Sequence, residues 1–196
     1  MKVIGITGGI GAGKSAVLKF LADNYKCEVI MADDVAKGLY YKGNKAYEMI
    51  TLLFGDAVLD KAGEINKKAL ADIIFANANK RAALDSIVHP LVKQEIINKV
   101  TNNRIADELD YTFVEAALLI DDHYDVFLDE VWYIDADEDI RRKRLKENRG
   151  YPDEKIDNIF ASQKSKEELI DKCDYCIDNS GDINRTFEEI RKLLDK

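Results

Sequence analysis

The residues Gly8 to Ser15 read Gly-Gly-Ile-Gly-Ala-Gly-Lys-Ser, which is a complete G-x-x-x-x-G-K-[ST] phosphate loop. Glycines at these positions let successive backbone N–H groups turn inward around a polyphosphate, and Lys14 can reach its terminal phosphates. The Ser15 hydroxyl suits a Mg²⁺ ion. The structural alternative is a tight glycine turn that only joins a strand to a helix. An apolar run before the loop and a helical pattern after it favour phosphate binding.

Asp33 is the next residue with the chemistry of a catalytic group. It lies just past the end of the segment Glu28–Met31, which is typical of a strand, with Ala32 between them. In a parallel sheet, ligands bind at the carboxyl ends of the strands, where a carboxylate could orient a hydroxyl and take its proton during attack on phosphorus. The alternative is that Asp33 caps a helix beginning at Asp34. The residues alone leave both open, and Asp34 itself fits the first helical turn better than a catalytic role.

Strands that alternate with helices predict an α/β fold with a five-stranded parallel sheet, interrupted once by a helical insert. The expected strands are Val3–Thr7, Glu28–Met31, Tyr111–Glu115, Val131–Asp135 and Tyr175–Asp178, with a first helix over Ser15–Asn24.

The insert is expected over about residues 41–104, where helical signals replace strand signals. Asn44 is placed to cap a helix that stops near Gly55, and Asn66 to cap a helix over Lys67–Phe75. Pro90 is expected in the first turn of a further helix, where proline is tolerated because its missing N–H has no partner there.

Composition narrows the class of partners. The 196 residues contain 37 acidic and 29 basic side chains, for a net charge of −8, which disfavours general binding to nucleic acid or to an anionic membrane. No apolar stretch reaches the length of a membrane span, and the opening residues lead straight into a strand, which predicts a cytoplasmic protein.

Cys173 and Cys176 have C-x-x-C spacing, but reduced, partly buried thiols are expected rather than a zinc or redox site.

The segment from Arg141 to Arg149 is a basic island in an acidic chain. One interpretation is a solvated helix face that begins with a favourable acidic turn at Asp137–Asp139. The other is a lid whose arginines close over phosphates and stabilise the charge that develops on the transferred oxygens.

The chain resembles the dephospho-coenzyme A kinases, which carry out the last step of coenzyme A synthesis. The resemblance spans nearly the whole sequence and is carried by these segments, in order: Ile6–Gly11 with Lys14-Ser15, Ala32-Asp33, Leu70–Phe75 with His89–Val92, Phe160–Gln163, and Asp174–Gly181. The His-Pro-Leu-Val block and the Ile-Asp-Asn-Ser-Gly segment are much narrower signals than the phosphate loop.

This resemblance implies a single P-loop kinase domain with a core of about residues 1–40, 105–135 and 174–196, a substrate insert of about 41–104 and a short helical lid of about 137–165. It implies that Asp33 is the base acting on the ribose 3′-hydroxyl of dephospho-coenzyme A, that His89 contributes to the substrate site, and that Ser15 holds Mg²⁺. For His89, a packed helix-boundary residue is the open alternative. The ATP site is then expected to comprise Gly8, Gly9, Gly11, Ala12, Gly13, Lys14, Ser15, Ala16, Asn179 and Ser180.

Several positions depart from the family pattern. Arg144 matches a lid arginine, but Asn148 stands where family members commonly carry another, so Arg149 is either its displaced equivalent or a surface residue. Ala16 replaces a frequent threonine and so removes a hydroxyl near the α-phosphate. Glu115 is a further candidate for positioning the waters of Mg²⁺, with a helix-starting carboxylate as its alternative.

The expected reaction is transfer of the ATP γ-phosphoryl group to dephospho-coenzyme A, with no nucleic acid, membrane or obligate protein partner. A nucleoside-monophosphate kinase, or another small-metabolite kinase, on the same scaffold is the nearest alternative. A GTPase-type switch would require a guanine-reading N-K-x-D motif, and no Asn-Lys pair in the chain is followed by Asp at that place. A catalytically inactive nucleotide sensor also remains open.

Overall fold

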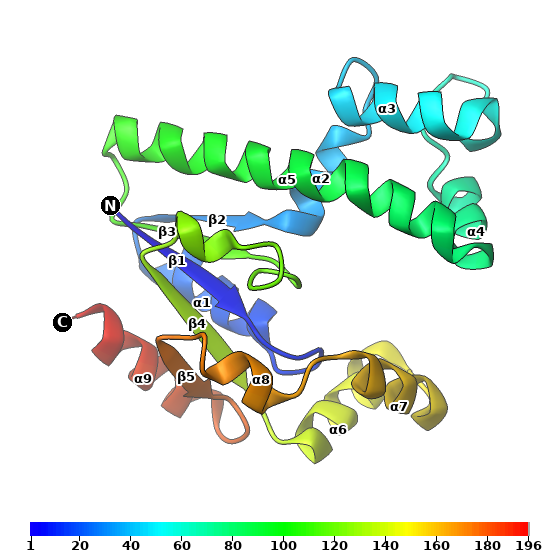
Figure 1. The fold of residues 1–196 in the computed structure, drawn as a ribbon. Helices are drawn as coiled ribbons and strands as arrows, with labels where there is room; N and C mark the ends of the chain where they lie inside the picture. Colours follow the sequence, from blue (N-terminus) through cyan, green and yellow to red (C-terminus); the bar gives the residue numbers. More distant parts are fainter. Residues whose placement is uncertain (196) are drawn as a thin grey trace. The chain divides into compact units, whose positions relative to one another are not determined.

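The computed structural model describes residues 1–195 (Figure 1). Its strands are β1 (Lys2–Thr7), β2 (Cys27–Met31), β3 (Tyr111–Glu115), β4 (Glu130–Asp135) and β5 (Tyr175–Asp178). Its helices are α1 (Lys14–Asn24), α2 (Ala32–Leu39), α3 (Lys45–Phe54), α4 (Lys67–Ala76), α5 (Ala78–Ala106), α6 (Glu138–Arg149), α7 (Asp153–Ser162), α8 (Lys166–Ile170) and α9 (Ile183–Leu194), with short 3₁₀ turns η1 (Gly55–Val58) and η2 (Tyr124–Val126).

The strands form one parallel sheet in the order β2-β3-β1-β4-β5. The first strand lies at the centre, where Ile4 pairs in register with Phe113 of β3 and Ile6 with Trp132 of β4. Helices connect the other successive strands, as is usual for parallel pairing, whereas β3 and β4 are joined by a segment whose only helical element is the 3₁₀ turn η2. The predicted α/β fold with a five-stranded parallel sheet is therefore confirmed, and the observed strands differ from the expected ones by at most one residue at either end.

The chain divides into two compact units. The first contains Met1–Val29 and the chain from Asn103 onwards, and the second is Ile30–Asn102. Most of the sheet, the phosphate loop and helices α6 to α9 belong to the first unit. Asp33, His89 and helices α2 to α4 belong to the second.

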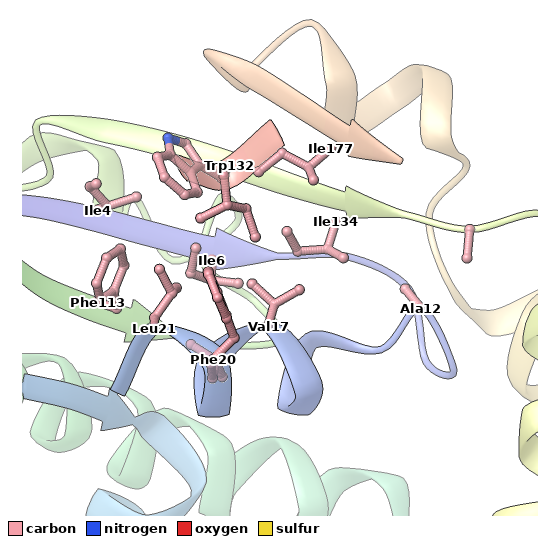
Figure 2. Packing of buried hydrophobic residues seen from close by; sticks show 13 residues of the cluster. Ile4, Ile6, Ala12, Val17, Phe20, Leu21, Phe113, Trp132, Ile134 and Ile177 are labelled. Atoms are coloured by element: carbon pink, nitrogen blue, oxygen red, sulfur yellow. The ribbon is translucent and has the colours of Figure 1, made fainter. Parts of the chain in front are cut away.

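The core of the first unit lies between the sheet and α1. Ile4, Ile6 and Phe113 of the strands belong to one buried cluster with Val17 and Leu21 of α1, and Figure 2 shows these side chains between the elements. All five side chains are completely buried. Burial of each such side chain contributes about 1.5–3 kcal/mol, so this layer fixes the strand from which the phosphate loop emerges.

Two aspartates fasten the ends of strands opposite the phosphate loop. Asp129 donates its backbone N–H to the carbonyl of Val3 (2.8 Å), and its carboxylate accepts the N–H of Val3 (2.7 Å). Asp174 makes the same pair of bonds with Val131, at 2.8 and 2.7 Å. Each aspartate thus closes a two-bond ring at the amino-terminal end of a strand pair.

The second unit is helical, and one sequence expectation about it is wrong. Pro90 lies inside the 29-residue helix α5 and not in a first helical turn. The buried residues of α5 recur every four positions on both sides of the proline, namely Leu84, Val88, Val92, Ile96 and Val100. Pro90 itself is exposed, so packing of this continuous apolar stripe outweighs the hydrogen bond that proline cannot make.

The expected caps of α3 and α4 have different outcomes. The Asn66 side chain accepts hydrogen bonds from Lys68 and Ala69 at the start of α4, as predicted. Asn44 does precede α3, but its amide donates to the carbonyls of Gly38 and Tyr41 and makes no capping bond. The amide is used instead to close the turn between α2 and α3.

Candidate active site

The phosphate loop leaves β1 at Thr7 and enters α1 at Lys14. Gly13 precedes the helix in a left-handed conformation (φ 94°), which glycine adopts without the steric cost that a Cβ brings. A Cβ added to Gly8, at φ 145°, would lie 2.3 Å from the carbonyl oxygen of Ile134 in the neighbouring strand. These two glycines are therefore required by the backbone path, in agreement with the motif.

Lys14 is turned back into the phosphate loop. Its ammonium donates to the carbonyl of Gly8 (2.8 Å) and lies 3.7 Å from the carboxylate of Glu115 at the end of β3. Burial lowers the pKa of Lys14, partly opposed by Glu115 and reinforced by the positive charge of Arg141. An incoming phosphate would therefore meet a largely desolvated cation, for which the electrostatic attraction is strong.

Asn179 fastens the outer side of the phosphate loop. It follows β5, is buried, and its amide nitrogen donates to the carbonyl of Ala12 (2.7 Å). Its side-chain oxygen accepts from the hydroxyl of Thr186 (3.1 Å) in α9. Asn179 was expected at the nucleotide site by resemblance, and the structure places it directly against the loop. The sequence alone did not indicate the bond to Thr186, because a contact between a loop residue and a residue of the following helix leaves no recognisable pattern.

Ser180 connects the same segment to the start of α6. Its hydroxyl accepts the backbone N–H of Asp137 (2.9 Å), and its own N–H donates to the carboxylate of Asp178 (2.9 Å). The bond from Ser180 lowers the pKa of Asp178. The loop after β5 and the first turn of α6 are thus joined through one serine hydroxyl.

Arg144 was predicted as a lid cation. In the structure it donates to backbone carbonyls, reaching Ala12 at 3.2 Å, Gly11 at 3.5 Å and Asn179 at 2.8 Å. These contacts bring α6 against both the phosphate loop and the loop after β5. Arg149 is exposed, and its hydrogen bond to the Tyr151 hydroxyl lowers the pKa of that tyrosine. That places Arg149 on the surface of the basic segment.

A cavity of about 710 Å³ opens beside the phosphate loop, within the first unit. Gly8 and Gly9 line one part of it, and Arg141 and Gln163 another. Two ion pairs, Lys164 with Asp121 and Lys166 with Asp135, also border it. The space lies next to the loop backbone that carries the phosphate-binding pattern, and its lining is mixed polar and apolar, as small-molecule sites usually are.

Two further residues of the expected nucleotide site are exposed. Ser15 and Ala16, in the first turn of α1, are both exposed, so the Ser15 hydroxyl is accessible to a ligand. Within the described residues no group of three or more His, Cys, Asp or Glu side chains could hold a metal ion. A magnesium site here would therefore use few protein oxygens, and the Ser15 hydroxyl and Glu115 carboxylate are chemically suitable ones.

Asp33 and His89 lie in the second unit. Asp33 is exposed in the first turn of α2, which begins at Ala32 and has Met31 at its N-cap. The alternative that Asp33 caps a helix beginning at Asp34 is therefore wrong, because the helix starts two residues earlier. Asp34 lies in the first turn, as expected, and pairs with Lys37 at 2.6 Å.

His89 lies in the interior of α5, so the helix-boundary alternative for it is also wrong. Its Nε2 is 3.8 Å from a carboxylate oxygen of Asp85, one turn earlier on the same helix. The sequence contained this i,i+4 pairing, but it could be recognised only once the helix was known to continue through Pro90.

The cysteines are partly buried, as predicted. Cys173 donates to the carbonyl of Leu169 at 3.3 Å. Burial, together with the nearby Asp174 and Cys176, raises the pKa of Cys173 to about 11. A thiol with this pKa is almost wholly protonated at neutral pH and is therefore a poor nucleophile.

A parallel sheet whose central strand leads through a G-x-x-x-x-G-K-S loop into a helix, with further helices after β4 packed on that loop, defines a P-loop kinase. Shikimate kinase from Bacteroides thetaiotaomicron shares this fold, with a TM-score of 0.55 at 15% identity over 100% of this chain and 99% of that one. The family model for dephospho-CoA kinase matches residues 2–185, and the chain belongs to that family. It is accordingly an ATP-dependent kinase, a transferase.

Full-length relatives support the same assignment. Dephospho-CoA kinase of Aquifex aeolicus is 34% identical over 196 residues, covering 100% of this chain and 97% of the relative. The Staphylococcus epidermidis enzyme is 33% identical over 195 residues, covering 100% and 95%. A solved structure from Thermus thermophilus gives a TM-score of 0.79 at 26% identity, covering 99% of this chain and 96% of that one.

Among the described residues, no helix is both long and apolar enough to cross a membrane.

Two residues that contact the phosphate loop were not identified as such from the sequence. Arg141 was indistinguishable from its neighbours in the basic segment, and Gln163 was noted only as part of a family segment. Both contact Ile10 of the loop, as described below.

Proposed function

We propose that this protein transfers the γ-phosphoryl group of ATP to the 3′-hydroxyl of dephospho-coenzyme A, giving coenzyme A and ADP. The single observation that carries the proposal is membership of the dephospho-CoA kinase family over residues 2–185, together with an intact phosphate loop. The desolvated Lys14 ammonium and the inward-turned loop support binding of a polyphosphate.

In the proposed reaction, the loop amides and Lys14 hold the β- and γ-phosphates. Asn179 and Ser180 border the nucleotide, and Arg144 holds α6 against the loop while charge develops on the transferred group. The bond between the γ-phosphorus and the bridging oxygen of ADP breaks as the acceptor oxygen attacks.

Asp33 is proposed as the base that orients the 3′-hydroxyl and accepts its proton. It is an exposed carboxylate directly after the carboxyl end of β2, the position at which parallel sheets present catalytic groups. His89, half-buried on α5, is proposed to contribute to binding of the acceptor.

Ser15 and Glu115 are the residues proposed to hold Mg²⁺, Glu115 through bound water. A magnesium ion at this place would neutralise charge on the phosphate oxygens during transfer. The accessible Ser15 hydroxyl and the oxygen chemistry of both side chains support this choice.

The proposal is tested by an assay of ADP release at fixed ATP with dephospho-coenzyme A, nucleoside monophosphates or water as acceptor. Strong preference for dephospho-coenzyme A is expected, with slow hydrolysis in its absence. Equal turnover with and without dephospho-coenzyme A would contradict the proposed acceptor.

The role of Asp33 is tested by Asp33→Asn, with Asp34→Asn as the matched control. Both variants remove one exposed carboxylate from the same helical turn. Asp33→Asn is expected to lower kcat by about 10²–10⁴-fold, because a general base contributes about this much, without changing the affinity for ATP. Asp34→Asn should retain nearly full turnover, and a similar loss in both variants would rule out the assignment.

A further inference from the structure

The basic helix α6 contains four arginines, and their surroundings differ. Arg142 is paired with the carboxylates of Glu138, Asp153 and Asp157. Arg144 donates to the backbone carbonyls described above, and Arg149 is exposed beside Tyr151. Of the four, only Arg141 lines the cavity beside the phosphate loop.

Arg141 packs directly on the phosphate loop. Its Nε donates to the carbonyl of Ile10 (2.9 Å), and a Cβ added to Gly9 would lie 2.5 Å from its guanidinium carbon. The guanidinium also lies over the ring of Phe160, 4.4 Å from the ring centroid. The guanidinium is thereby held close to both the phosphate loop and the Phe160 ring, and Arg141 lines the cavity.

Gln163 completes the arrangement from the end of α7. Its side-chain oxygen accepts from Nη2 of Arg141 (2.7 Å) and from the backbone N–H of Ile10 (3.3 Å). One amide oxygen therefore ties the guanidinium to a loop N–H of the phosphate-binding motif. The bond between Ile10 and Gln163 joins residues that are 153 positions apart in the chain.

Arg141 retains unused donors in this position. An arginine has five N–H groups, and the contacts to Ile10 and Gln163 use two of them. Both acceptors are neutral oxygens, and among the described residues no carboxylate lies within ion-pair distance of Arg141. A phosphate oxygen would form charge-assisted bonds that are roughly twice as strong as neutral ones.

The two lysines that line the cavity are already paired. Lys164 and Lys166 are paired with Asp121 and Asp135. Among the described residues that line this cavity, Arg141 is therefore the cation for which no anionic partner lies within ion-pair distance. Its charge also contributes to the lowered pKa of Lys14, which means that the two cations act on the same region.

We propose that Arg141 is a catalytic residue that binds the transferred phosphoryl group, and that Gln163 is a positioning residue acting through Arg141. This proposal rests on the proposed kinase function and adds a specific residue to it. Family members commonly carry a second lid arginine where this chain has Asn148, and we assign the role of that second cation to Arg141. Arg144 instead holds the phosphate loop through its backbone carbonyls.

The test compares binding of ADP with binding of the non-hydrolysable ATP analogue AMP-PNP, by calorimetry with Mg²⁺ and without acceptor. Arg141→Ala is expected to weaken AMP-PNP binding by about 10–100-fold and ADP binding by less than about 2-fold, because only AMP-PNP carries the third phosphate. Lys143→Gln is the control, since it removes one exposed positive charge from the same helix. It should change neither affinity.

Gln163→Ala is expected to weaken AMP-PNP binding less than Arg141→Ala does. Because Gln163 acts through Arg141, the double variant should bind AMP-PNP no more weakly than Arg141→Ala alone. Additive losses would overturn the positioning role. Equal weakening of ADP and AMP-PNP by Arg141→Ala, or no weakening, would overturn the assignment of Arg141.

The binding test is independent of the acceptor. If the wild type binds AMP-PNP but does not phosphorylate dephospho-coenzyme A, the proposed function fails while the selective effect of Arg141→Ala still supports its phosphate contact. If the wild type binds neither nucleotide, both proposals are wrong. Thermal unfolding of each variant shows whether a binding loss reflects misfolding.

Discussion

A buried hydrogen bond from a neutral amide anchors the phosphate loop, whereas exposed ion pairs hold α6 and α7 together. Asn179 anchors the loop at Ala12 from a fully buried position. Between the helices, Arg142 reaches Asp157 at 2.7 Å and Lys146 reaches Asp153 at 2.7 Å, all at the surface. Buried hydrogen bonds have steep geometric requirements, while surface ion pairs tolerate movement and are screened by salt. The two regions therefore differ in how strongly their contacts should depend on geometry and on salt.

The largest expected effect comes from Gly13→Ala, compared with Gly150→Ala. Both glycines have positive φ, 94° and 62°, but a Cβ on Gly13 would lie 2.2 Å from the Asn179 amide, whereas one on Gly150 meets no atom within 4 Å. Gly13→Ala should destabilise the protein by about 3 kcal/mol, from backbone strain plus the lost Asn179 bond, and abolish nucleotide binding. Gly150→Ala should cost about 1 kcal/mol, from strain alone.

Chemical denaturation and ADP calorimetry on both variants provide the measurement. Similar losses in the two variants would mean that the loop is no more tightly constrained than the turn between α6 and α7.

An intermediate effect is expected from Lys14→Met, which removes the buried cation of the loop. The variant should lose turnover without losing stability, because burial of the ammonium lowers the pKa of Lys14 and so disfavours the charged native form. Between that lowered pKa and 10.5, the unfolded chain keeps a proton that the native protein has released. The stability of the wild type relative to Lys14→Met should therefore rise with pH across this interval.

Urea unfolding of both proteins at about pH 8 and about pH 10 tests the sign. A stability difference that stays constant or falls with rising pH would show that the Lys14 charge is not disfavoured in the folded loop.

The smallest effect is expected from Arg142→Ala. Its three carboxylate partners are exposed, so the variant should lower the unfolding temperature only slightly. The difference from wild type should disappear at about 1 M NaCl, where the Debye length falls to about 3 Å. Thermal unfolding at low and high salt measures it, and a large difference that persists in salt would remove the contrast with the phosphate loop.

The sheet was predictable from sequence because its strands are short apolar runs bounded by turn residues. Val131–Asp135 and Tyr175–Asp178 could be located within one residue for this reason. The phosphate loop was equally predictable, because the residues that define its motif are consecutive in the sequence. The continuation of α5 through Pro90 was not, since it depends on what the apolar stripe packs against.

The candidate site was predictable only in part, because many of its contacts join distant segments. The phosphate-loop motif identified Lys14, and resemblance to the kinase family identified Asn179 and Arg144 as candidates. The bonds from Gln163 to Arg141 and Ile10 leave no periodic pattern, and four arginines in one helix cannot be told apart by spacing. Their different roles follow from which face of α6 meets the phosphate loop.

The two-bond rings formed by Asp129 with Val3 and by Asp174 with Val131 have a consequence for alignment of the sheet. Each ring forms only when the aspartate stands opposite its valine. Sliding the strand by two residues would break both hydrogen bonds of the ring and leave the N–H of the valine without its carboxylate acceptor. Strand alignment is thus enforced at the end of the sheet that carries no phosphate loop. The phosphate loop, at the opposite end of the sheet, therefore does not have to set the alignment of these strands.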